Sequence, residues 1–212
     1  MDDRIDQGVI DDVIESGRIM EEKGMMNSFE GNISVRKDGL LYITPTGRSK
    51  ALLTPNQIAV MDGEGNQIAG DFKPSSEFLM HRGVYGIRAG IGAVAHCHSP
   101  YLTAYALCHK ELTCDCYPEF LMHFKEIKVA PYGAPGTSAI YEGAKEILKN
   151  HCVVLLANHG VLAIGSTALM ACCRLEAAEA AAKIISIARS IGTAVPLPEQ
   201  EIARIRGINI PV

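Results

Sequence analysis

The hydrophobic positions predict a helix and two strand hairpins in the first third of the chain. Apolar residues recur at helical spacing from residue 5 to residue 20, and Gly24 follows as a stop signal. Two short apolar runs, 31–36 and 40–47, flank a Lys-Asp-Gly turn, which is typical of paired strands. Residues 58–70 repeat this pattern around a Gly-Glu-Gly-Asn tip.

The rest of the chain alternates between strand and helix patterns. Strands are predicted at 91–98, 126–130, 152–157 and 161–165. Helices are predicted at 74–88, 100–107, 137–150 and 166–191, with a short one after Pro198, whereas most of 109–136 is irregular. Because several strands follow one another through tight turns, we expect a mixed, mostly antiparallel sheet with helices packed over it, in one domain covering residues 1–212.

The composition excludes several classes of protein. The chain has 212 residues, 48% of them hydrophobic and 21% charged, as in an ordinary globular protein. A net charge of −4 without a basic stripe argues against a nucleic-acid partner. The apolar stretches are interrupted by Asn158, His159 and Lys183, and the acidic N-terminus is unlike a signal peptide, so no membrane segment is predicted. Seven cysteines without a CxxC pair predict reduced thiols in a cytoplasmic protein.

Three histidines and one glutamate are candidates for a metal site. His96 and His98 end an apolar strand and share one of its faces, since side chains two apart point the same way. His159 lies in a turn between two predicted strands, and Glu77 lies at a predicted helix start. Three histidines and a carboxylate are a standard ligand set for catalytic zinc. Taken singly, each has a structural interpretation: a polar strand end, a turn histidine bonded to the local backbone, or a carboxylate favoured by the helix dipole.

Three other segments suit an anion such as a phosphate. A helix start with Ser75 and Ser76 offers two hydroxyls and free backbone N–H groups. The segments Thr-Pro-Thr-Gly at 44–47 and Glu-Gly-Asn-Ile-Ser at 30–34 add hydroxyls, flexible glycines and an amide. Each of these segments alone is also explained as a cap or a turn.

Together, five short motifs resemble the class II aldolase/adducin-head family in order and spacing, over residues 5–190. They are Gly31-Asn32-Ile33-Ser34, Thr44-Pro45-Thr46-Gly47, Ser75-Ser76-Glu77, His96-x-His98 and Asn158-His159-Gly160. Within the family, the motifs are most similar to those of the L-fuculose-1-phosphate aldolases. The resemblance implies a three-layer α/β/α fold around a central, mostly antiparallel mixed sheet.

The resemblance also implies a reaction and roles for the motif residues. A ketose 1-phosphate would be cleaved reversibly to dihydroxyacetone phosphate and an aldehyde, through an enediolate that one zinc ion per subunit stabilises. His96, His98 and His159 would bind zinc, and Glu77 would be a fourth ligand at rest that becomes the acid/base when substrate binds. The residues implied to hold the substrate phosphate are Gly31, Asn32, Thr46, Gly47, Ser75 and Ser76.

Further implications concern the assembly. The resemblance implies a homotetramer with active sites between subunits. Tyr117 matches the place where the family presents a tyrosine from the neighbouring subunit as a proton donor. An interface or core role for Tyr117 is the alternative. The other histidines (81, 109, 123 and 151) are interpreted as structural or surface residues. The cysteines at 114, 116, 172 and 173 are interpreted as buried or interface thiols, with metal binding as the alternative.

Three alternative functions stay open at this point. Glu119 matches the neighbourhood of a catalytic glutamate in methylthioribulose-1-phosphate dehydratases, and 5-deoxypentulose-phosphate aldolases are close relatives. A ketose-phosphate 4-epimerase is disfavoured because Ser-Ser-Asp-Thr is its pattern, whereas Phe78 follows Glu77 here. A non-enzymatic adducin-head module would not need the metal ligands. The C-terminal tail lacks the tyrosine of the fuculose-phosphate enzymes, so the aldehyde is left open.

Overall fold

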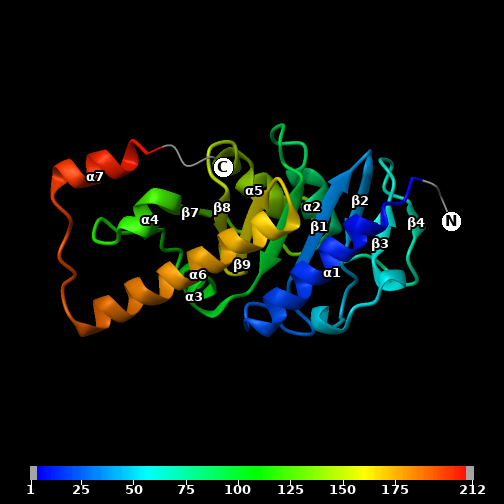
Figure 1. Cartoon of the computed structure of the whole chain (residues 1–212), viewed down its shortest axis with the longest axis horizontal. Coiled ribbons are helices and arrows are strands. Elements are labelled where there is room, and N and C mark those ends of the chain that lie inside the picture. The colour runs from blue at the N-terminus through cyan, green and yellow to red at the C-terminus, as the bar shows by residue number, and fades with distance from the viewer. Residues whose placement is uncertain (1–3, 209–212) are drawn as a thin grey trace.

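A nine-stranded mixed sheet forms the centre of the molecule (Figure 1). The computed structural model describes residues 4–208. The strand order is β4-β3-β2-β1-β5-β9-β8-β7-β6, and all neighbours are antiparallel except β7 and β8. The strands are β1 (Asn32–Lys37), β2 (Leu40–Ile43), β3 (Ala59–Met61), β4 (Gln67–Ala69), β5 (Ala93–Cys97), β6 (Leu112–Thr113), β7 (Glu126–Ala130), β8 (Val153–Leu156) and β9 (Gly160–Gly165).

Helices cover both faces of this sheet. The helices are α1 (Gln7–Glu22), α2 (Phe78–Val84), α3 (Pro100–Leu107), α4 (Pro118–His123), α5 (Ala139–Leu148), α6 (Ala168–Ile191) and α7 (Glu199–Arg206), with two short 3₁₀ turns at Lys50–Leu52 and Pro55–Gln57. α1, α3 and α6 pack on one face, and α2 and α5 pack on the other. The expected three-layer α/β/α arrangement with a mostly antiparallel mixed sheet is therefore confirmed.

The pleat of β5 separates the two cores. Ala93, Ala95 and Cys97 belong to the cluster under α3 and α6, whereas Val94 belongs to the cluster under α2 and α5. His96 therefore points to the α2 side, opposite Cys97, and it is fully buried. A central strand with neighbours on both edges thus carries the first of the candidate ligands.

Two predictions of local structure were wrong. The helix predicted at 74–88 spans only Phe78–Val84. It begins late because Pro74 pairs with Pro45 in an antiparallel bridge and the Ser75 N–H donates to the Thr44 carbonyl at 3.1 Å. The segment 109–136, expected to be irregular apart from its strand, also contains β6 and α4. The Cys- and Pro-rich composition of this segment gives no clear helix or strand pattern. These short elements are stabilised by tertiary packing rather than by intrinsic helix or strand propensity.

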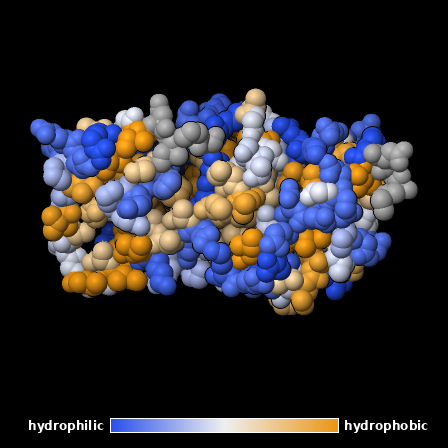
Figure 2. Space-filling view, viewed as in Figure 1, coloured by the Kyte–Doolittle hydropathy of each residue, from blue (hydrophilic) through white to orange (hydrophobic). Residues whose placement is uncertain are grey.

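The outer face of α6 carries a hydrophobic stripe. Ile184, Ile187 and Ile191 recur at helical spacing and are 46%, 44% and 82% exposed. Figure 2 shows hydrophobic surface over the C-terminal end of this helix. No helix within residues 4–208 combines the length and the hydrophobicity needed to cross a membrane.

Candidate active site

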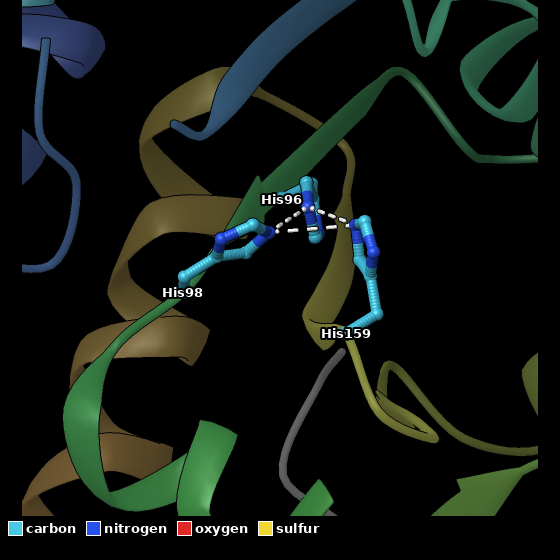
Figure 3. A group of neighbouring side chains, drawn as sticks. All are labelled: His96, His98 and His159. Atoms are coloured by element: carbon cyan, nitrogen blue, oxygen red, sulfur yellow. Dashed lines mark hydrogen bonds between the residues drawn. The ribbon is translucent and has the colours of Figure 1, made fainter. Parts of the chain in front are cut away.

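Three imidazole rings converge at the end of β5. His96 and His98 come from β5 and the residue after it, and His159 comes from the turn between β8 and β9 (Figure 3). The Nε2 atom of His96 lies 3.0 Å from the Nε2 atoms of both His98 and His159, and the other two are 3.4 Å apart. In a tetrahedral zinc site, bonds of about 2.0–2.1 Å place ligand nitrogens roughly 3.3 Å apart. The three nitrogen atoms are therefore spaced as ligands of one small cation.

The His96 ring is oriented by the neighbouring strand. Its Nδ1 atom lies 2.9 Å from the Val161 carbonyl oxygen, which can only accept, so Nδ1 carries the proton and Nε2 presents a lone pair to the centre. Burial lowers the pKa of His96 to about 3, although the Glu77 charge opposes this shift. Burial also lowers the pKa of His98, with a further contribution from His159. Neutral rings are the form that binds a metal.

Glu77 completes this cluster from the residue before α2. Its Oε1 atom lies 2.9 Å from His159 Nε2, its Oε2 atom lies 3.2 Å from His96 Nε2, and Asn32 Nδ2 donates to Oε2 at 2.8 Å. Burial raises the pKa of Glu77, whereas the hydrogen bond from the Asn32 amide and any positive charge on the neighbouring His96 and His159 rings lower it, and the balance lies below the usual value.

The chemistry of this donor set fits a divalent cation. Glu77 Oε1 is buried and accepts no hydrogen bond from the described residues. The 2.9 Å contact to His159 Nε2 would satisfy this oxygen only if that nitrogen carried a proton. An ionised oxygen facing nitrogen lone pairs in a buried site is unfavourable unless a cation lies between them. His96, His98, His159 and Glu77 are thus a donor set that matches zinc.

Backbone geometry at the β8–β9 turn brings His159 to the other two rings. Asn158 adopts a left-handed conformation with φ of 56°, which asparagine tolerates better than most residues. Gly160 lies so close to β5 that a Cβ atom there would be 2.6 Å from the Cys97 carbonyl oxygen and from His98 Cδ2. Backbone geometry therefore explains the residues on both sides of His159 in the Asn-His-Gly motif: asparagine tolerates the left-handed conformation, and only glycine fits beside β5.

A cavity of about 180 Å³ adjoins the histidines and the carboxylate. Glu77, His98 and His159 line one part of it. All six residues that the sequence assigned to phosphate binding also line it, namely Gly31, Asn32, Thr46, Gly47, Ser75 and Ser76. The structure thus brings together segments that are far apart in the sequence, with the metal-type ligands and the hydroxyl-bearing segments around one space.

Lys50 also lines this cavity, and sequence analysis did not identify it. The lysine is only 1% exposed, and its ammonium donates to the carbonyls of Asn27 at 3.3 Å and Glu30 at 3.0 Å. Burial lowers its pKa, while the charges of Glu21 and Glu30 oppose that shift. A buried cation beside the cavity favours an anionic ligand. The only sequence signal was a lysine three residues after the Thr-Pro-Thr-Gly motif.

Glu179 on α6 supports the strand end that carries His98. Its carboxylate accepts hydrogen bonds from the Ser99 hydroxyl at 2.8 Å and from the backbone N–H groups of Tyr101 and Leu102 at 2.9 Å each. These donors lie at the start of α3, where Ser99 makes no side-chain cap of its own. Glu179 is therefore the cap of α3, supplied from a different helix.

Tyr117 does not line the cavity within the part of its own chain that the structure describes. It precedes α4 and packs, half-buried, against the core under α6. Glu119 is exposed on the first turn of α4. The Sγ atoms of Cys114 and Cys116 lie 2.8 Å apart beside this segment. A role for Tyr117 at a neighbouring subunit's site therefore stays a prediction.

Comparisons with known proteins identify the family. Residues 11–186 match the family described as Class II Aldolase and Adducin N-terminal domain. The chain is 34% identical over 199 residues to a 5-deoxy-D-ribulose 1-phosphate aldolase of Bacillus thuringiensis serovar kurstaki, covering 92% of each chain. It is 35% identical over 178 residues to a 3-oxo-tetronate 4-phosphate decarboxylase of Haemophilus influenzae, covering 81% of this chain and 84% of that one.

A solved structure agrees with these relatives. An L-fuculose 1-phosphate aldolase superposes with a TM-score of 0.86 at 32% identity, covering 95% of this chain and 96% of the other. The family and its aldolase relatives make this protein an enzyme of the lyase class. The chain belongs to the class II aldolase/adducin family.

Proposed function

We propose that this enzyme is a zinc-dependent aldolase that reversibly cleaves a ketose 1-phosphate to dihydroxyacetone phosphate and an aldehyde. The observation that carries the proposal is the shared cavity, in which Glu77 and two imidazoles of the three-histidine cluster adjoin segments suited to a phosphate. We further propose that the chain acts as one catalytic domain in the cytoplasm, which accords with its seven free cysteines.

His96, His98 and His159 would hold the zinc ion, with Glu77 completing the set before substrate binds. When bound, zinc would supply Lewis-acid stabilisation of the negative charge that develops on the substrate when the carbon–carbon bond breaks. The protein contributes ligand orientation, since the Val161 carbonyl fixes the His96 ring.

Glu77 is the proposed acid/base. Its Oε2 atom is occupied by the Asn32 amide, whereas Oε1 accepts no hydrogen bond from the described residues, so Oε1 is the atom proposed to take and return the substrate proton. The lowered pKa of this carboxyl keeps it ionised at neutral pH, which is the form that a base requires.

The other part of the cavity would bind the substrate phosphate. Ser75 and Ser76 offer hydroxyls, Gly31 and Gly47 allow the backbone to approach closely, and Lys50 places a buried positive charge nearby. A phosphate held at one end orients the bond to be cleaved at the other end.

A substrate panel with a coupled assay for dihydroxyacetone phosphate tests this proposal. L-fuculose 1-phosphate, 5-deoxy-D-ribulose 1-phosphate and 5-methylthioribulose 1-phosphate would be incubated with zinc-loaded protein. Release of dihydroxyacetone phosphate supports the proposal and identifies the aldehyde. Conversion without it contradicts the proposal and indicates a dehydratase or an epimerase, and no conversion of any of the three compounds also contradicts the proposal.

A second candidate function comes from the Haemophilus influenzae relative. Because that protein is named a 3-oxo-tetronate 4-phosphate decarboxylase, the same panel would include 3-oxo-tetronate 4-phosphate. Carbon dioxide released from this compound, without cleavage of the ketose 1-phosphates, would favour the decarboxylase.

We also propose a homotetramer in which Tyr117 reaches the site of a neighbouring subunit. The exposed Ile184, Ile187 and Ile191 stripe and Phe29, which lines the cavity and is 85% exposed, are consistent with surfaces that an assembly covers. Sedimentation would give the oligomeric state. Mixing inactive Tyr117→Phe and Glu77→Gln subunits should restore part of the activity if each site takes residues from two subunits, and no recovery would contradict the shared site.

A further inference from the structure

A row of buried polar side chains runs from Glu77 away from the cavity. Asn32 donates to Glu77 at 2.8 Å, and the Asn32 Oδ1 atom contacts His81 Nε2. On the other side of that ring, Nδ1 lies 2.7 Å from Ser34 Oγ, which in turn lies 2.7 Å from the Tyr85 hydroxyl. All five side chains are less than 9% exposed, and His81 is fully buried.

Two elements supply this row through their regular spacing. Glu77, His81 and Tyr85 are separated by four residues each, so they lie along one side of α2 and its flanking residues. Asn32 and Ser34 are two apart on β1 and share one face of the strand. Because this side of α2 packs against this face of β1, side chains from the helix and the strand alternate along the row.

For a neutral His81 ring, only one arrangement of protons satisfies every contact in the row. The ionised Glu77 accepts, so the Asn32 amide must present its NH₂ group to Glu77 and its oxygen to His81. The His81 Nε2 atom must then carry the proton, and Nδ1 must accept from the Ser34 hydroxyl. Ser34 accepts from Tyr85 in turn. Burial lowers the pKa of His81 to about 4, so the ring is neutral at neutral pH.

We infer that His81 is a positioning residue of the active site, which fixes the orientation of the Asn32 amide and through it that of Glu77. The inference rests on the role proposed for Glu77. If His81 carried its proton on Nδ1, the Asn32 amide would turn over and place its oxygen against the Glu77 carboxylate, where two acceptors repel each other. His81 therefore selects the amide orientation that holds the carboxylate beside His96 and His159.

The first test is nitrogen NMR of metal-free protein labelled at histidine. His81 should be neutral with its proton on Nε2 between about pH 5 and 8. A proton on Nδ1, or a charged ring in this range, would overturn the inference. This measurement uses the wild-type protein and does not depend on catalysis or on the folding of a variant.

The second test measures zinc affinity by calorimetry in three variants. His81→Met removes both hydrogen bonds and should weaken zinc binding about 10- to 100-fold, as is typical when a partner of a ligand is lost. His81→Gln keeps a donor for Asn32 and should stay within about threefold of the wild-type affinity. Met80→Leu, a buried neighbour in α2 outside the row, is the control and should bind zinc like the wild type.

The outcomes separate this inference from the proposed function. Equal losses in His81→Met and His81→Gln, or wild-type affinity in both, would overturn the positioning role. If the wild-type enzyme cleaved none of the ketose 1-phosphates, the proposed function would fail, whereas the His81 proton position and the affinity ratio would stand. If the enzyme is active, His81→Met should lower kcat more than it raises KM for the ketose phosphate, because the row ends at Glu77 and contains only Asn32 of the six residues assigned to the phosphate.

Discussion

Gly160 and His98 approach so closely that a Cβ atom on Gly160 would lie 2.6 Å from the imidazole Cδ2 atom. The same Cβ would lie 2.6 Å from the Cys97 backbone oxygen, which cannot move without displacing β5. We therefore expect Gly160→Ala to push the His98 ring away from the other two and to weaken zinc binding at least about 10-fold, as measured by calorimetry on metal-free protein. Gly86→Ala is the control, because its Cβ would make only an ordinary 3.4 Å contact; equal zinc affinity in both variants would refute the steric account.

Removal of a histidine ligand should remove the metal. We expect His96→Ala and His159→Ala proteins, purified without chelator, to contain little zinc by atomic emission spectrometry and to lack lyase activity. The exposed His123 on α4 is the matched control, and His123→Ala should retain both. Full zinc content in His96→Ala would show that the metal site lies elsewhere.

Glu77→Gln should separate metal binding from turnover. The amide keeps an oxygen that can face the cation but cannot accept the substrate proton, so kcat should fall about 10²–10⁴-fold while the three histidines retain zinc. Steady-state kinetics and metal analysis of the same preparation measure the two effects. The surface variant Glu64→Gln is the control, and wild-type turnover in Glu77→Gln would exclude the acid/base role.

Glu179 should contribute to stability through the start of α3. Glu179→Ala leaves the Ser99 hydroxyl and the Tyr101 and Leu102 N–H groups without their acceptor, and the free energy of unfolding should fall by about 1–3 kcal/mol. Denaturant titration measures this loss. Glu176→Ala, on the same helix, removes only an exposed ion pair with Lys23 and should cost under about 1 kcal/mol. Equal losses in the two variants would contradict the capping role of Glu179.

Acid should destabilise the metal-free protein partly through His81. Burial lowers the pKa of His81 in the folded protein from 6.5 to about 4, and the charge of Glu77 opposes this shift. The hydroxyl of Tyr85, which lies beyond Ser34, is neutral. Between these two values the unfolded chain binds more protons, so stability is fully present above about pH 6.5 and falls as the pH drops to about 4, by about 3 kcal/mol in total. Urea titrations across this range should show a shallower pH dependence for His81→Gln than for wild type; identical slopes would contradict the prediction.

The five motifs and the family resemblance that they carry were sufficient to predict the three layers and most of the polar residues around the cavity. The period-two placement of His96 and His98 and the turn position of His159 depend on local spacing alone. His81, Lys50 and Glu179 were not identified because their roles depend on docking between distant segments: His81 meets Asn32 across 49 positions and Glu179 meets Ser99 across 80. The start of α2 was misplaced for the same reason, since the bridge between Pro45 and Pro74 is a tertiary contact.

The position of β5 between β1 and β9 has a consequence for the metal-free state. Amides in a strand paired on both edges exchange with solvent mainly through global opening of the protein, whereas frayed termini and surface loops exchange through local opening. The backbone that carries His96 should therefore be among the slowest to exchange, whether or not zinc is bound. Binding of the proposed zinc ion should then cost little ordering entropy, and removal of zinc should leave the protein folded.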